Sequence, residues 1–260
     1  MHVLLGETIT AHLCIVGTMN KDQLSEFLTA DLIYTQEESM EAMNRMRIPI
    51  ETSARHVHLC QKEFEALFGE GARPTPLKYL SQPGQYLSQE RVTVIGPKGQ
   101  FENVGILGPL RKESQVEVSQ TDTRKLGLPG IIRQSGDIVE TPGCILQAGD
   151  KQVELEKGVI VAKRHIHMTP TDAIRFQVHD NDLVCVVAKS YERYLIFADV
   201  VVRIDKSFKL AMHVDTDEAN AVAGDGENYG LIVKLFDYRY FSMDQWMEEL
   251  EQGIYRNHQI

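Results

Sequence analysis

The motif Arg-His-aliphatic-His occurs twice in this chain, as Arg55–His58 and again as Arg164–His167. In each copy it closes a short run that is typical of a β-strand. Alternate residues of a strand point to the same face, so the two histidines of each copy share a face. One such pair alone would be unremarkable for a half-exposed strand. Because two imidazoles on one face form half of a nitrogen-rich zinc site, the second copy predicts two related metal sites.

The similarity between the two copies extends beyond the histidines. A short helix is predicted after each, over Gln61–Phe68 and from Thr169 to Ile174, the second with threonine as N-cap, proline at N1 and an acid at N3. Each half then contains a β-branched strand that ends on lysine, Val92–Lys98 and Val184–Lys189. We therefore predict an internal duplication.

A third potential ligand stands at the equivalent place near the end of each half. The segments Gln115–Ser119 and Ala211–Asp215 both precede a Thr-Asp pair, which aligns Glu117 with His213. The predicted metal ligands are His56, His58 and Glu117 in the first half, and His165, His167 and His213 in the second. Three protein ligands leave one coordination position open, which is typical of catalytic rather than structural zinc.

Strand patterns outnumber helical ones in the body of the chain. Short apolar runs bounded by Gly, Pro, Asp or Lys occur at Val104–Leu107, Ile138–Val139, Val153–Leu155, Val159–Val161 and Leu195–Phe197. We predict a mainly β fold with short helices, in which two small β-barrel domains related by internal duplication hold a di-metal site between them. The predicted parts are an N-terminal extension over 1–45, the two barrel repeats over 46–150 and 151–235, and a helical tail over 236–260.

The two outer segments carry helical patterns. Apolar residues recur at helical spacing within 20–33, which fits either a helix lying on the core or a targeting helix. The tail has a capping-box pattern at Ser242 and Gln245 and a glycine stop at Gly253, and its apolar stripe is expected to dock on the body or on a second subunit.

Composition excludes several classes of partner. The formal net charge of −10 argues against nucleic acid, because phosphate backbones require a basic face. The 4 cysteines form no C-x-x-C pair, which favours reduced thiols and a cytoplasmic setting. Neither a secretory signal nor a membrane-spanning run is apparent.

Arg111 is the candidate anion-binding residue. It follows the turn at Gly108-Pro109 and stands shortly before Glu117 in the chain. An arginine in a turn is often merely solvated. Beside a metal ligand, however, its planar guanidinium would clamp a phosphate or carboxylate with parallel donors.

Taken together, these motifs closely resemble the PduL-type phosphate acyltransferases (phosphate propanoyltransferase). The segments that carry the resemblance are Ser53–Leu59, Leu107–Ser119, Arg164–Met168 and Met212–Asn220, and the match extends over about Ile48 to Lys234. The resemblance implies two divalent metal ions, usually Zn²⁺, on the two ligand sets, and phosphate on Arg111. It also implies coenzyme A near Thr52, Ser53, Ala54, Lys98 and Asn220.

The activity implied is reversible transfer between acyl-CoA (propanoyl-CoA or acetyl-CoA) and phosphate, giving acyl phosphate and coenzyme A by metal-assisted direct attack. Members of the family are often cargo of bacterial microcompartments, so 20–33 is a candidate targeting helix, with shell or cargo proteins as candidate partners and a homo-oligomer as another option. Two positions depart from the expected pattern. Gly105 stands where a basic or larger coenzyme-contacting residue is expected, and Cys60 stands where a hydroxyl N-cap is expected.

Other functions compete for the same histidines. A metal-dependent amidohydrolase also uses His-x-His on a strand, but it requires strand-helix alternation over a longer chain. A duplicated cupin is closer, since Glu63 mimics the acid of its first metal motif, although Asp172 at the equivalent place favours a helix-capping role for both acids. A metal-stabilised scaffold protein is the non-enzymatic alternative, and the open three-ligand sites argue against it.

Overall fold

The structure is a computed structural model that describes residues 45–189, 193–222 and 228–233. The helix predicted over 20–33 and the tail over 236–260 lie outside these residues. Met1–Arg47 and Ile48–Ile260 are separate units, and every feature below belongs to the second.

The described part is mainly β with four short helices, as predicted. The helices are α4 (Gln61–Phe68), α5 (Gln120–Leu126), α6 (Pro170–Phe176) and α7 (Thr216–Val222). The strands of the first half are β2 (His56–His58), β3 (Pro76–Tyr79), β4 (Tyr86–Ile95), β5 (Gln100–Gly108), β6 (Gln115–Val118), β7 (Ile132–Arg133), β8 (Cys144–Ala148) and β9 (Lys151–Leu155). The remaining strands are β1 (Ile48–Thr52), β10 (Val159–Ala162), β11 (His165–Met168), β12 (Leu183–Lys189), β13 (Tyr194–Ile204), β14 (Ala211–Val214) and β15 (Asn228–Val233).

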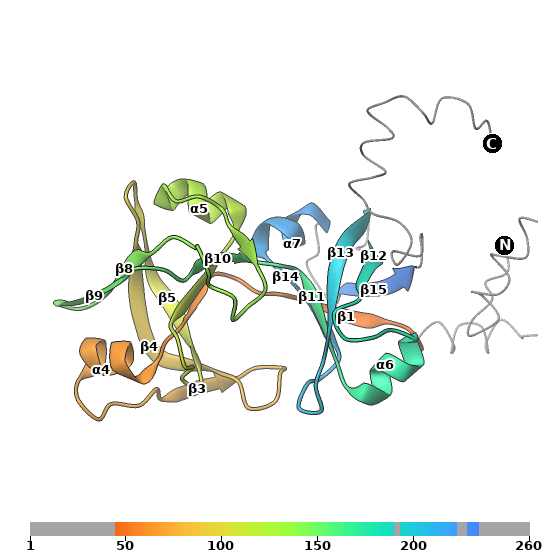
Figure 1. The fold of residues 1–260 in the computed structure, drawn as a ribbon, viewed down its shortest axis with the longest axis horizontal. Helices are drawn as coiled ribbons and strands as arrows, with labels where there is room; N and C mark the ends of the chain where they lie inside the picture. The colour runs from red at the N-terminus through yellow and green to blue at the C-terminus, as the bar shows by residue number, and fades with distance from the viewer. Residues whose placement is uncertain (1–44, 190–192, 223–227, 234–260) are drawn as a thin grey trace, which may run out of the picture. The chain divides into compact units, whose positions relative to one another are not determined.

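Six strands form a closed barrel in the order β1-β14-β11-β13-β12-β15 (Figure 1). Its interior is filled by apolar side chains that are almost completely buried, among them Ile166, Val186 and Val202. These β-branched residues alternate with outward-facing ones along their strands, which is the pattern that a small filled barrel requires.

The other strands form a nine-stranded sheet, ordered β7-β10-β6-β2-β5-β4-β8-β9 with β3 added on β4. Its core includes Val57, Phe64, Ile106 and Leu146. The prediction of two barrels is wrong for this half: within the described residues β7 and β9, at the two ends of the strand order, each pair with one neighbour only, so this sheet does not close.

The two sheets exchange one strand each. β1 directly precedes β2 in the chain, yet it pairs with β14 of the barrel. β10 directly precedes β11, yet it pairs in parallel with β6 of the open sheet. In Figure 1 the orange strand β1 accordingly lies among the blue-green barrel strands. The division at 46–150 and 151–235 stays a prediction, and the strand pairing crosses it in both directions.

The equivalent elements of the two halves nevertheless pair alike, which supports the duplication. His56 lies opposite Glu117 in the antiparallel pair β2–β6, and His165 lies opposite His213 in the antiparallel pair β11–β14. The predicted cap of α6 is confirmed, with Thr169 and Asp172 forming a capping box and Pro170 in the first turn. The α4 N-cap is Cys60, whose side chain makes no capping bond.

The strand predicted at Ile138–Val139 is not formed, whereas the expectation of reduced cysteines agrees with the structure. Ile138–Val139, predicted as a strand, lies in a loop, where Val139 is exposed and Asp137 accepts its backbone N–H. Cys60 and Cys144 carry free thiols, as expected. None of the described helices is long and apolar enough to span a membrane.

Candidate metal centre

The first ligand set comes together on the two neighbouring strands β2 and β6. His56 Nε2 lies 3.1 Å from His58 Nε2, 3.6 Å from Glu117 Oε2, and all three side chains are buried. His58 Nε2 lies 3.7 Å from Glu117 Oε1. Ligand atoms about 2.1 Å from one metal ion at tetrahedral angles would be separated by about 3.4 Å, which is the spacing found here.

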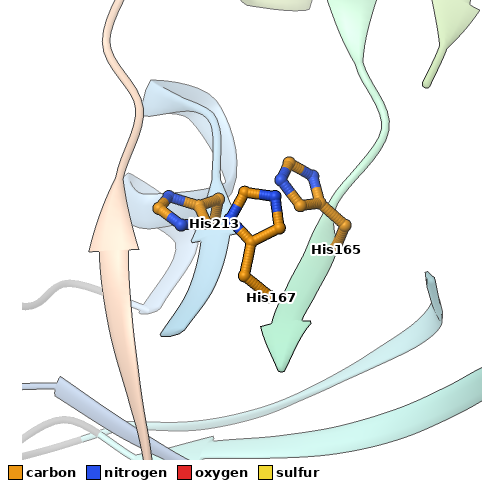
Figure 2. Close-up of side chains that lie close together, drawn as sticks. All are labelled: His165, His167 and His213. Carbon is orange, nitrogen blue, oxygen red and sulfur yellow. The ribbon is translucent and has the colours of Figure 1, made fainter. Parts of the chain in front are cut away.

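The second ligand set has the same origin in the other half. Figure 2 shows the rings of His165 and His167 projecting from β11 toward that of His213 on β14. The ring centroids lie 4.6 Å apart for His165 and His167, and 4.9 Å apart for His167 and His213. In both sets the ligand atoms lie within 4.8 Å of one another, so either set could hold a metal ion.

Backbone carbonyls orient one imidazole in each set. His56 Nδ1 lies 2.8 Å from the Ala54 carbonyl and His165 Nδ1 lies 2.9 Å from the Lys163 carbonyl, in both cases the residue two positions earlier. A carbonyl can only accept, so each Nδ1 carries the proton and each Nε2 presents a lone pair. This is how a metal-binding histidine is normally fixed in its tautomer.

Burial and charge keep two ligands of the first set, His58 and Glu117, in metal-binding form. Burial, followed by the charge of His56, holds the pKa of His58 well below its ordinary value. Burial raises the pKa of Glu117, but His56 and His58 outweigh it and hold that pKa well below its usual range. Burial also lowers the pKa of His56, and the Glu117 carboxylate more than offsets this, so that pKa is raised. A cation at this place would replace the proton on His56.

The second set contains no carboxylate, and its pKa values move in one direction. Burial and the neighbouring His213 lower the pKa of His165 to about 4. Burial and His165 lower the pKa of His167 to about 2. These imidazoles are therefore neutral at neutral pH, as metal coordination requires. The ligand types, spacing, orientation and protonation of both sets fit a divalent metal ion.

The lowered pKa values predict how the metal-free protein responds to acid. The unfolded chain binds more protons than the folded chain below pH 6.5, because the pKa values of His165 and His167 fall from 6.5 on folding. The free energy of unfolding should therefore decrease from pH 6.5 toward pH 4, by about 1.4 kcal/mol per pH unit for each histidine. Folding raises the pKa of His56, so His56 changes the free energy of unfolding only above pH 6.5 and not between pH 6.5 and 4.

Urea unfolding of chelator-treated protein across this pH range measures the effect. His167→Gln should make the pH dependence less steep, because it removes one of the histidines whose pKa folding lowers. A stability that does not change between pH 6.5 and 4, or one that rises with acid, would contradict the protonation states assigned above.

The arginine of each Arg-His-x-His motif braces the ligand strands. Arg55 donates to both carboxylate oxygens of Asp122, at 3.0 and 2.7 Å, and Asp122 is the capping-box acid of α5 just after β6. Arg164 donates through Nη1 to one carboxylate oxygen of Glu218 of α7 at 2.8 Å, just after β14. Each arginine thus ties a His-x-His strand to the helix that follows the third ligand, a structural role that the sequence had not revealed.

Both ligand sets line one cavity of about 770 Å³. Arg111 and Arg203 line it as well, together with the predicted coenzyme-contacting residues Thr52, Ser53 and Ala54. Lys98 and Asn220, predicted for the same role, are exposed and are not among the lining residues. Gly105 lines the cavity opposite Arg91, which also lines it, so a basic residue is present one strand away from the position where one was expected.

Arg111 is positioned by its own backbone and by a hydroxyl. Its N–H donates to the Leu59 carbonyl at 2.9 Å, and Nη1 donates to Ser135 Oγ at 2.9 Å. Ser135 Oγ in turn donates to Glu117 Oε1 at 2.7 Å. Burial, and secondarily Arg203, lower the pKa of Arg111, whereas Glu117 raises it. The short chain distance between Arg111 and Glu117 does bring them into one network, through a serine that sequence reasoning missed.

Other contributing residues also went unpredicted. Gln115 donates to Glu117 Oε1 at 2.6 Å, and its place two residues earlier on β6 could have indicated that it shares the ligand face. Phe208 packs its ring on His167 at 4.1 Å. No local pattern identified Ser135, Phe208 or Arg203, because each reaches the cavity only through tertiary contacts.

The geometry agrees with what comparison with known proteins shows. A family profile described as phosphate propanoyltransferase matches residues 49–225. A phosphate propanoyltransferase of Leptotrichia buccalis is 52% identical over 203 residues, covering 78% of this chain and 94% of the relative. One from Thermotoga maritima is 53% identical over 174 residues, covering 67% and 83%, and one from Salmonella typhimurium is 46% identical over 191 residues, covering 74% and 90%.

Proposed function

Since the chain belongs to the phosphate propanoyltransferase family, we propose that it transfers the acyl group of propanoyl-CoA or acetyl-CoA to phosphate, reversibly, with two divalent metal ions. The metal ligands proposed are His56, His58 and Glu117 for one ion, and His165, His167 and His213 for the other. Zn²⁺ is the ion that nitrogen-rich three-ligand sites favour.

One observation carries this proposal. The two ligand sets, which are far apart in the chain, line a single cavity together with Arg111. A reaction between a thioester and a phosphate needs both an electrophilic centre and an anion clamp within reach of each other. Metal ions that only stabilised two separate domains would not require a shared, solvent-accessible cavity that contains an arginine.

The residues support a direct displacement. When bound, the metal ions would supply positive charge that polarises the thioester carbonyl. Arg111, fixed by Ser135, would hold hydrogen phosphate in position for attack. A phosphate oxygen bonds to the carbonyl carbon, the carbon–sulfur bond breaks, and the proton of hydrogen phosphate passes to the departing thiolate. The products are acyl phosphate and coenzyme A.

An acyl-enzyme is not supported by the side chains around the histidines. The ring nitrogens of the described cluster histidines contact backbone carbonyls, one another, Glu51, Glu117 and Gln82. None of them hydrogen-bonds to a described serine or cysteine, the pairing that activates a nucleophile. Phosphate itself is therefore the proposed nucleophile.

Coenzyme A is proposed to enter along the strand end that precedes the first motif. Thr52, Ser53 and Ala54 line the cavity there, and Ala54 also fixes His56 through its carbonyl. Lys98 and Asn220, being exposed and outside the cavity, are proposed for the distal part of this long ligand, where basic and amide side chains can bind phosphates.

A metal-dependent hydrolase, including a duplicated cupin, is the second candidate. The cupin interpretation needs Glu63 as a ligand, whereas the Glu63 carboxylate contacts Cys60 and accepts from Ser114 Oγ at 3.0 Å. It is thus engaged at the start of α4, apart from the first ligand set. This observation favours the transferase.

The test is the release of free thiol from propanoyl-CoA and acetyl-CoA by metal-loaded protein. A transferase should release thiol only when phosphate is present and should form acyl phosphate in equal amount. Thiol release that does not depend on phosphate would instead identify a hydrolase. Elemental analysis should give two metal ions per chain.

We further propose that residues 20–33 direct the enzyme to a bacterial microcompartment in the cytoplasm, as is frequent in the family, with shell or cargo proteins as partners. Removing residues 1–45 should then leave the kinetics in solution nearly unchanged and abolish co-purification with shell proteins. Co-expression with a shell, followed by sedimentation, measures this. Loss of soluble protein would mean instead that the segment completes the core.

A further inference from the structure

Arg203 lies beside the second ligand set. It stands on β13 in register with His167 of β11. Aligned residues on paired strands point their side chains to the same face of a sheet, and both residues line the same cavity. Phe208 packs on the His167 ring at 4.1 Å, and its ring centroid lies 6.0 Å from Arg203 Cζ. The guanidinium of Arg203 therefore faces the metal centre.

Among the residues that the structure describes, no acid pairs with the charge of Arg203. Arg164, which is half-buried like Arg203, pairs with an acid, and so does Arg55, whereas the side chain of Arg203 has no hydrogen bond or ion pair to any described residue. Burial lowers the pKa of Arg111, and the charge of Arg203 lowers it further. Arginines in partly buried positions are normally paired with acids. Arg203 instead lies close enough to a second cation, Arg111, for the two charges to repel, an arrangement that an anionic ligand would relieve.

We infer that Arg203 is a second phosphate-binding residue, so that the acceptor phosphate is held between Arg203 on β13 and Arg111 after β5. This inference rests on the proposed transferase function. Hydrogen phosphate carries two negative charges and presents oxygens in tetrahedral directions. Two guanidiniums reaching it from different sheets can each supply a pair of parallel donors.

Two guanidiniums also make the site selective. A tetrahedral dianion satisfies both arginines, while water or a singly charged carboxylate leaves one of them unmatched. Arsenate should consequently replace phosphate as acceptor, and sulfate should compete with phosphate. Exclusion of water as acceptor follows from the same arrangement, since a neutral molecule gains little from either cation.

Steady-state kinetics of the metal-loaded full chain tests the inference. In Arg203→Gln, the KM for phosphate at saturating acyl-CoA should rise about 10- to 100-fold, the loss typical of one charge-assisted pair. The inhibition constant of sulfate should rise in parallel, while the KM for acyl-CoA and the metal content stay near wild type. With Arg203→Ala, added guanidinium chloride should restore part of the rate at low phosphate. Arg73→Gln is the matched control, because Arg73 is exposed and pairs only weakly, at 3.4 Å, with Glu65.

Several outcomes would overturn the inference. Unchanged phosphate and sulfate constants would show that Arg203 does not touch the acceptor, and a rise confined to the KM for acyl-CoA would assign it to the coenzyme. If Arg203→Gln fails to fold, Arg203→Lys, which keeps the charge, must still raise both constants. Wild-type protein that releases thiol without phosphate would refute the proposed function itself, and that result is visible before any variant is made.

Discussion

His56→Ala and His165→Ala should each give a folded protein that has lost one of its two metal ions and all measurable acyl transfer. Each change removes one of only three protein ligands from a set that is otherwise intact. Dividing the about 10–16 kcal/mol of a four-ligand zinc site equally gives about 2.5–4 kcal/mol per ligand, or a loss of metal affinity of roughly 60- to 700-fold. Because the proposed reaction uses both ions, either loss should stop it.

Metal content per chain after chelation and reloading, measured together with thiol release, checks this result. The two variants should each retain one equivalent, since the ligand sets lie on different strand pairs. His179→Ala is the matched control, because His179 is exposed and lies outside the cavity. Full activity of metal-free wild-type protein would refute the role of the metal ions. Loss of both ions in one variant would show that the two sites are not independent.

Arg111→Lys should lower kcat/KM for phosphate about 100-fold, although it conserves the charge. Lysine offers a point charge without the planar pair of donors, and the loss of a charge-assisted pair costs about 2–3 kcal/mol. The backbone bond of residue 111 to Leu59 does not depend on its side chain, so the loop should keep its position. Coenzyme A binding and metal content should stay close to normal.

Arg111→Ala should be more severe and should expose slow, phosphate-independent hydrolysis of the thioester, because water can enter the vacated space. Initial rates with phosphate varied at saturating acyl-CoA separate the effect on the acceptor from any effect on the coenzyme. Arg73→Lys serves as the control. Wild-type phosphate kinetics in both Arg111 variants would leave Arg111 as a turn residue with no part in binding the acceptor.

Much of the candidate centre could be predicted from the sequence because its information is local. The pairing of His56 with His58, and of His165 with His167, follows from the period of a strand, which fixes which residues share a face. Comparing the two halves then identified Glu117 and His213 as equivalents. In the sheets, Glu117 lies opposite His56 and His213 lies opposite His165. The capping box of α6 was readable for the same reason, since its donors and acceptors are three residues apart.

The tertiary structure decided what depends on residues far apart in the chain. No local pattern distinguishes a strand that pairs within its own half from β1 and β10, which cross to the other sheet. Closure of one sheet and not the other depends on whether end strands meet, which is a property of register across the whole sheet. Arg203, Ser135 and Phe208 became visible only once these pairings had brought them to the cavity, because a side chain's chemical role depends on its neighbours in space.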